Sequence, residues 1–271
     1  MRKTILIPTD FSAVCTNATN HAAKLAENIG ARLIVLHVVN PDSLSFIKGN
    51  NLEPSYIDNE LYAIRKRLEE SYNIVIHTIK KEGKLFSVIT QMCEQLKADL
   101  VVIGTHGKTG IQKITGSHAM KLIRALDIPV LVVQKRDISG GYKKIIFPIN
   151  VSTEYTVKVD WTVFISKAFK SDVLLFTMKT VDERLTKAMN NIVEKITMSF
   201  EEHGIKYNLT EAKKSDEFPE QINEFAVSNS ADLIMIKVDN DEFEPSFILG
   251  AIEEKNIFNS SQIPVFCAQK K

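Results

Sequence analysis

Hydrophobic and polar positions in the first half of the chain form short apolar runs separated by amphipathic stretches. The runs are rich in Ile, Val and Leu and do not alternate with polar residues, which is typical of parallel strands buried on both faces. We therefore expect five strands, at Thr4–Pro8, Arg32–Val38, Asn73–Lys80, Leu100–Gly104 and Val130–Val133.

The stretches between these runs carry apolar residues at helical spacing. They predict helices at Ser12–Ile29, with Ser12 as the N-cap and Gly30 just past the end, and at Asn59–Tyr72 and Leu85–Leu96. Strands that alternate with helices in this way predict an α/β fold with a parallel sheet.

The second half of the chain repeats the first. Four segments recur in the same order: KTILIPTDFSA as KKIIFPINVST, RLIVLHV as DVLLFTM, ADLVVIG as ADLIMIK, and IPVLVVQK as IPVFCAQK. We expect two tandem doubly wound domains, at 1–137 and 142–271, each a five-stranded parallel sheet with helices on both faces. The turn-rich segment 137–142 would link them, and the polar segment 40–58 is interpreted as a loop beside the functional site.

Composition excludes several classes of protein. The net charge of +1 gives no general attraction to nucleic acid or to an acidic membrane, and no apolar stretch is long enough to span a bilayer. Three widely separated cysteines match no metal-binding spacing and suggest a reducing compartment. Pro8 and Asp10 interrupt the first apolar run, so it is not a signal peptide, and we expect a cytoplasmic protein.

The segment Gly104–Ser117, GTHGKTGIQKITGS, lies between a predicted strand and a predicted helix. Glycines allow a close approach of the backbone to an anion, and a helix N-terminus attracts phosphate. Lys108 and Lys113 would lie near that charge. The pattern is neither a Walker A loop nor a dinucleotide fingerprint, and a long turn without a ligand is the alternative interpretation.

Taken together, these motifs resemble the universal stress protein family in both halves of the chain. They are PTDFS after the first strand, LHVV in the second, the Gly104–Gly107 pair, a spacer, Gly116-Ser117 before a helix, and a final PVLVV strand. The spacer has eight residues between Gly107 and Gly116, whereas the family's nucleotide-binding branch has nine.

The resemblance implies an ATP site, with Mg²⁺ as a plausible companion, in the first domain. The resemblance implies that Asp10 contacts adenosine, that Pro8 and Thr9 shape the same wall, and that the backbone of Val38 meets the adenine edge. The remaining residues would line the ribose and phosphates. The full set is Pro8, Thr9, Asp10, Val38, Ile103, Gly104, Gly107, Gly116, Ser117 and His118.

These residues also have structural interpretations. Asp10 could be only a turn or cap residue, and Ser117 only a helix N-cap. His37 lies within an apolar strand, where a core histidine with satisfied hydrogen bonds is expected. We find no nucleophile paired with a base and no identifiable metal-binding carboxylate, so we expect slow ATP hydrolysis at most.

The second copy lacks the glycine-rich segment. Asn150 stands where the first copy has Asp10, and an acidic run follows the fourth strand, made up of Asp239, Asp241, Glu242, Glu244, Glu253 and Glu254. Carboxylates repel phosphate, so this domain is interpreted as a structural partner that forms a pseudo-dimer with the first through the PVLVV and PVFCA strands. Further homodimerisation and unknown protein partners stay open, as does the rival function of an interaction module without nucleotide.

Overall fold

The chain forms two compact units, Met1–Ile138 and Ser139–Lys271. The computed structural model describes residues 2–105, 116–151, 155–237, 259 and 261–268.

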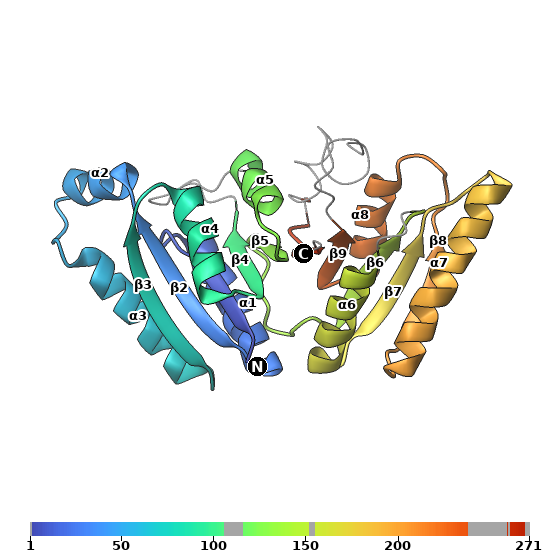
Figure 1. Cartoon of the computed structure of the whole chain (residues 1–271), viewed down its shortest axis with the longest axis horizontal. Helices are drawn as coiled ribbons and strands as arrows, with labels where there is room; N and C mark the ends of the chain where they lie inside the picture. The colour runs from blue at the N-terminus through green and yellow to red at the C-terminus, as the bar shows by residue number, and fades with distance from the viewer. Residues whose placement is uncertain (1, 106–115, 152–154, 238–258, 260, 269–271) are drawn as a thin grey trace. The chain divides into compact units, whose positions relative to one another are not determined.

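The first unit contains a parallel five-stranded sheet in the order β3-β2-β1-β4-β5 (Figure 1). The strands are β1 (Thr4–Pro8), β2 (Arg32–Val39), β3 (Val75–Glu82), β4 (Leu100–Gly104) and β5 (Val130–Val133). Every residue of β1, β4 and β5 is buried, which explains why these runs are apolar without alternation. The five predicted strands are therefore confirmed, with small shifts at the ends of β2 and β3.

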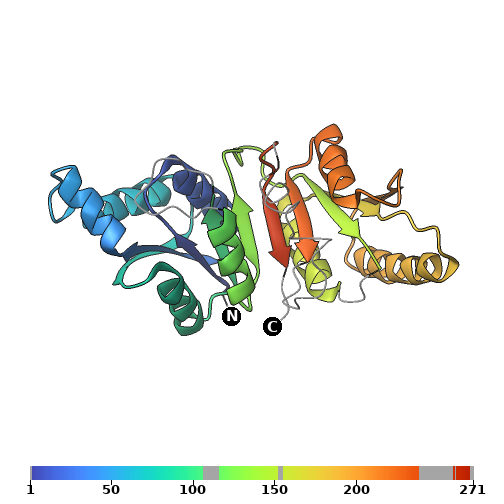
Figure 2. The ribbon, with the colours of Figure 1, turned by 90° about the horizontal axis from the view of Figure 1, so that it is seen from above.

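Helices cover both faces of this sheet (Figure 2). On one face lie α1 (Ala13–Ile29) and α3 (Tyr56–Ser71), and on the other lie α4 (Leu85–Leu96) and α5 (Gly116–Ala125). The predicted caps of α1 are confirmed. The Ser12 side chain accepts a hydrogen bond from Cys15 N, and Gly30 ends the helix with a left-handed φ of 66°.

The prediction of a loop over 40–58 is wrong. Helix α2 spans Pro41–Gly49, and α3 begins at Tyr56 rather than at Asn59. The Asn40 side chain caps α2 by accepting a hydrogen bond from Ser43 N at 2.9 Å, and Pro41 occupies the first turn, where its missing N–H leaves no bond unmade. Ser43 is the buried residue of α2, so its sequence shows no apolar stripe from which a helix could be inferred.

The second unit repeats the topology, with the strand order β10-β9-β6-β7-β8. Its strands are β6 (Lys144–Ile149), β7 (Asp172–Thr177), β8 (Tyr207–Glu211), β9 (Leu233–Lys237) and β10 (Val265–Ala268). Helices α6 (Thr156–Phe169) and α7 (Glu183–Glu202) cover one face, and α8 (Phe218–Ser228) covers the other. The chain is thus a tandem of two doubly wound α/β units.

The segment between the predicted domains is less solvated than its turn residues suggest. Tyr142 is buried and packs edge-on against Phe169, with ring centroids 5.1 Å apart. Gly141, at a φ of 73°, passes so close that a Cβ would lie 2.8 Å from the Phe169 ring. The end of this segment therefore belongs to the core of the second unit.

Gly104→Ala should lower the free energy of unfolding by about 1–3 kcal/mol. An added Cβ would lie 3.0 Å from Val14 O and 3.1 Å from Cys15 N, and these main-chain atoms cannot yield unless α1 moves. Gly49→Ala is the matched control, because nothing lies within 4 Å of a Cβ there. Urea unfolding of the ligand-free protein measures the stability of both variants. Equal stabilities would show that α1 can move away from β4 at little cost.

Candidate functional site

Three adjacent strands of the first unit bring most of the predicted site residues to one edge of the sheet. Because β2, β1 and β4 are neighbours and parallel, Pro8, Val38 and Gly104 all lie near the carboxyl ends of their strands. The connections from β1 and β4 lead to helices on opposite faces, so this edge is the topological switch point of the unit. Ligands of open α/β sheets bind at such an edge.

The turn that follows β1 is held by hydrogen bonds. Thr9 N donates to Leu36 O of β2 at 2.8 Å, which continues the sheet by one residue. Phe11 N donates to Thr9 Oγ1 at 3.1 Å, and Ser12 N donates to Asp10 Oδ1 at 2.9 Å. Asp10 is 8% exposed, and it acts as a turn residue whatever else it binds.

Phe11 adopts a conformation that the sequence does not reveal. Its φ of 65° is unusual for a residue with a side chain, and it places the ring against His37, with centroids 4.5 Å apart and planes 13° apart. His37 Nδ1 donates to Thr9 O at 2.8 Å, and the Ser43 hydroxyl lies 3.4 Å from Nε2. The prediction that His37 is a satisfied core histidine is confirmed, and burial lowers its pKa.

Val38 and Cys15 complete the wall around Asp10. Val38 is buried, and its carbonyl oxygen accepts a hydrogen bond from Ser43 Oγ at 3.2 Å. Burial raises the pKa of the Cys15 thiol, and the carboxylate of Asp10 raises it further. The thiol therefore stays protonated, which excludes it as a nucleophile at neutral pH.

The end of β4 lies directly against the start of α1. A Cβ at Gly104 would be 3.0 Å from Val14 O, so close packing of the two elements requires glycine here. Ile103 is fully buried, and Thr105 N donates to Val133 O at 3.0 Å, one residue beyond the end of the strand.

Helix α5 begins at Gly116, so the backbone of Ser117 lies within the first turn. The interpretation of Ser117 as the N-cap is therefore wrong, because the chain becomes helical before it reaches this residue. His118 shares the same turn. Gly107 lies outside the described residues, as do Lys108 and Lys113.

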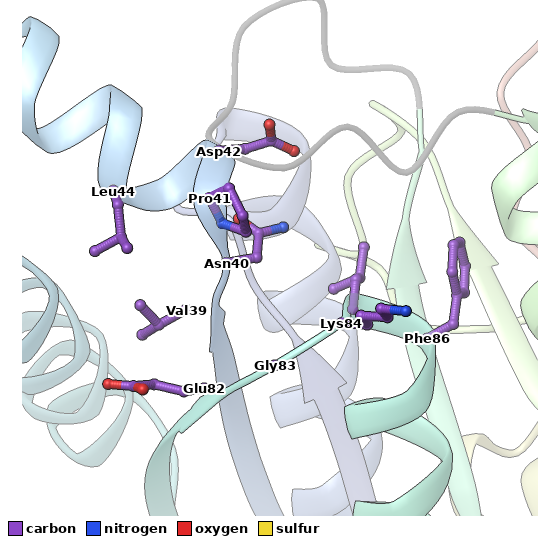
Figure 3. Close-up of a pocket in the computed structure, with 10 residues that line it drawn as sticks. Val39, Asn40, Pro41, Asp42, Leu44, Glu82, Gly83, Lys84 and Phe86 are labelled. Atoms are coloured by element: carbon purple, nitrogen blue, oxygen red, sulfur yellow. The ribbon is translucent and has the colours of Figure 1, made fainter.

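A pocket of about 690 Å³ opens beside the ends of β2 and β3 (Figure 3). It lies between the start of α2 and the start of α4, and its apolar lining includes Val39, Leu44 and Phe86. Asp42, Glu82 and Lys84 supply the charges around it. This pocket was not predicted from the sequence, because α2 forms one of its walls and residues 40–58 were interpreted as a loop.

The described residues contain no cluster of three or more His, Cys, Asp or Glu residues that could hold a metal ion. Nor do they include a helix with the length and apolar character needed to cross a membrane.

The second unit has a lysine where the first has alanine. Lys158 corresponds to Ala18 in the repeat and is 7% exposed. Its Nζ donates to Pro148 O at the end of β6, at 2.5 Å, and lies 4.1 Å from the centre of the Phe147 ring. Burial, together with the positive charge of Lys237, lowers the pKa of Lys158 to about 7. The acidic run 239–254 lies outside the described residues.

Comparisons with known proteins agree on one family. The family model described as "Universal stress protein family" matches residues 1–134. A universal stress protein of Methanocaldococcus jannaschii is 38% identical over 143 residues, which are 49% of this chain and 82% of that protein. Universal stress protein G of Escherichia coli O157:H7 is 30% identical over 144 residues, which are 49% of this chain and 100% of that protein.

A solved structure matches nearly the whole chain. The crystal structure of a universal stress protein from Archaeoglobus fulgidus DSM 4304 aligns with a TM-score of 0.69 at 15% identity. It covers 99% of this chain and 98% of that one. At this identity the match shows a shared fold.

Lys158→Met should raise the free energy of unfolding at neutral pH by on the order of a few kcal/mol, because it removes a buried charge. The unfolded chain keeps this proton up to the ordinary lysine pKa of 10.5, whereas the folded chain releases it near pH 7. Between these values the unfolded state binds more protons, so the wild type gains stability as pH rises and the advantage of the variant shrinks.

Urea unfolding near neutral pH and at about pH 10 measures this advantage. Lys167→Met is the matched control, because Lys167 is exposed on the same helix and its removal should change stability little at either pH. A loss of stability in Lys158→Met at neutral pH would show that the contacts of the buried ammonium group outweigh the cost of burying its charge.

Proposed function

The chain belongs to the universal stress protein family, and we propose that its first unit binds an adenine nucleotide, ATP in the cell. The observation that carries this proposal is the convergence of Asp10, Val38 and Gly104 at the switch-point edge, on the side where α5 begins. The second unit would act as a structural partner that holds no nucleotide.

Asp10 supplies the group that recognises adenosine. One carboxylate oxygen accepts the Ser12 N–H, so the orientation of the side chain is set before any ligand arrives. A preorganised and largely buried carboxylate is a strong acceptor for ribose hydroxyls or for the base amino group. Phe11 and His37, stacked on each other behind the turn, support this wall.

The base would lie beyond the end of β2. The pocket that begins at Val39, directly after Val38, falls within the size range of small-molecule sites. Val39, Leu44 and Phe86 offer apolar contacts for a planar ring. The Val38 carbonyl oxygen accepts a hydrogen bond from Ser43 Oγ at 3.2 Å, and it lies at the strand end where the base edge would be.

Phosphates would lie between the end of β4 and the start of α5. The first N–H groups of a helix have no partner within the helix and attract anions. Mg²⁺ would enter with the triphosphate, bound to phosphate oxygens and water.

A regulatory role fits this site better than a catalytic one. Cys15 is held protonated beside Asp10. His37 is fully buried, with Phe11 stacked on its ring and the Ser43 hydroxyl 3.4 Å from Nε2, so neither residue is placed to activate water. Partner proteins would then respond to nucleotide occupancy. In the rival function, an interaction module, the same fold would recognise partners without any nucleotide.

Each chain should bind one nucleotide, despite its two units. By the sequence repeat, Lys237 stands where the first unit has Gly104, and Asn150 stands where it has Asp10. Native mass spectrometry of the full chain with added ATP counts the ligands directly. Two bound nucleotides would contradict the structural role of the second unit, and none would favour the interaction module.

Asp10→Asn should weaken the binding of adenosine, AMP and ATP by a similar factor, roughly tenfold to a hundredfold. The Asn oxygen can still accept the Ser12 N–H, so the turn should survive while the charge is lost. Titration calorimetry measures the affinities, and circular dichroism checks the fold. Asp127→Asn, an exposed site beyond α5, is the control. Equal affinities in both variants would leave Asp10 with its turn role only.

A further inference from the structure

Helix α2, which forms one wall of the pocket beside β2 and β3, has no counterpart between β7 and α7 of the second unit. There β7 ends at Thr177 and α7 begins at Glu183, and the whole connection lies within the described residues. The helix adds little to the core of its own unit, because Ser43 is its buried residue and Leu44 is 57% exposed. What α2 provides is therefore a pocket wall and not core packing.

Lys84, on the opposite wall, has a position that helix stability does not explain. It occupies the N-cap of α4 and makes no capping hydrogen bond. An ammonium group has no acceptor with which to cap a helix, and a positive charge is unfavourable beside a helix N-terminus. The side chain forms no hydrogen bond or ion pair with any residue that the structure describes. Its charge is available to a ligand of the pocket.

Two carboxylates from different elements line the same pocket. Glu82 is the last residue of β3, and Asp42 lies in the first turn of α2. Within the described part of the chain neither side chain forms a hydrogen bond or an ion pair. Figure 3 shows Glu82 to the left of the end of β2, on the same side as Val39 and Leu44. Asp42 and Lys84 lie to the right of it.

A ligand that complements this lining carries two cationic groups, one anionic group and an apolar stem. An α-amino acid with a cationic side chain has all of these. Its ammonium and carboxylate groups would pair with Asp42 and Lys84 on one side of the pocket, and its methylene groups would lie over Val39 and Leu44. The side-chain cation would then reach Glu82. The net charges also match, because two carboxylates and one ammonium group give the pocket −1 and the amino acid carries +1.

We propose that this pocket binds a free amino acid with a cationic side chain, lysine or arginine. The amino-acid site stands on the pocket alone. Val39 and Leu44 are also the contacts proposed for the base, so the amino acid and the nucleotide would exclude each other. This competition rests on the proposed function, and through it nucleotide occupancy would respond to the level of a basic amino acid.

The first test compares L-lysine with three analogues that each lack one charged group. Norleucine lacks the side-chain cation, cadaverine lacks the carboxylate, and Nα-acetyllysine lacks the α-ammonium group. Ligand-observed NMR and calorimetry on the full chain without nucleotide give the affinities. Lysine should bind more tightly than each analogue by roughly twofold to fivefold, the range of a solvent-exposed ion pair.

Substitutions assign each preference to one side chain. Glu82→Gln should remove the preference for lysine over norleucine and keep the preference over cadaverine, whereas Lys84→Met should do the reverse. A folding defect cannot produce this crossed pattern. Glu53→Gln is the matched control, because Glu53 is an exposed carboxylate between α2 and α3 that does not line the pocket. It should keep both preferences.

Competition is measured separately. A fixed concentration of lysine should raise the apparent Kd of ATP for the wild type, and should raise it less for Glu82→Gln. Lysine that binds without affecting ATP would overturn the competition and place the base outside this pocket, while the amino-acid site would stand.

The remaining outcomes decide the amino-acid site itself. Wild-type protein that binds ATP but not lysine would overturn this site and leave the nucleotide proposal intact. Equal affinities for lysine and cadaverine would show a general attraction of cations and would overturn it too. So would preferences that survive both Glu82→Gln and Lys84→Met.

Discussion

The contact between the end of β4 and the first turn of α1 determines the geometry of the first unit's functional edge. It depends on a missing side chain, because a Cβ at Gly104 would lie 3.0 Å from Val14 O. The turn before α1 is bonded to β2 through Thr9 N and Leu36 O. One close approach and one hydrogen bond thus hold the ends of β2, β1 and β4 in fixed relation, with Asp10 between them.

His37 supports the same turn from the β2 side. Burial lowers its pKa, so the ring is neutral at physiological pH, and a neutral ring that donates from Nδ1 to Thr9 O can only accept at Nε2. Phe11 closes over the ring in a left-handed conformation that a stacked contact stabilises. A histidine that sequence reasoning assigned to the core therefore contributes to the shape of the functional edge.

Strands and helices with a periodic or capped sequence pattern can be predicted from the sequence. Contacts that depend on the position of a single atom cannot. Strand runs such as Leu100–Gly104 and the capped helix α1 were predictable, because burial and capping leave periodic or local signals. Helix α2 was missed because Ser43 is its buried residue; Asn40-Pro41, a cap followed by proline, was the available signal. The buried hydroxyl of Thr105, which has no hydrogen-bond partner among the described residues, is visible only in three dimensions, since any neighbouring acceptor would have satisfied it.

The two units share one fold and differ at the ends of their strands. Strand order survives because it depends on apolar runs, and both units retain them. The strand ends are free to diverge. By the sequence repeat, Lys237 of the second unit corresponds to Gly104, whose missing side chain lets the end of β4 pack closely against α1. The second unit has a side chain at this position, so its corresponding strand and helix cannot pack at the same distance. The ammonium group of Lys158 lies at the end of β6, whereas the corresponding residue of the first unit, Ala18, carries no charge. The divergence therefore lies where ligands would bind, as expected if selection maintains the second sheet for its packing and not for its chemistry.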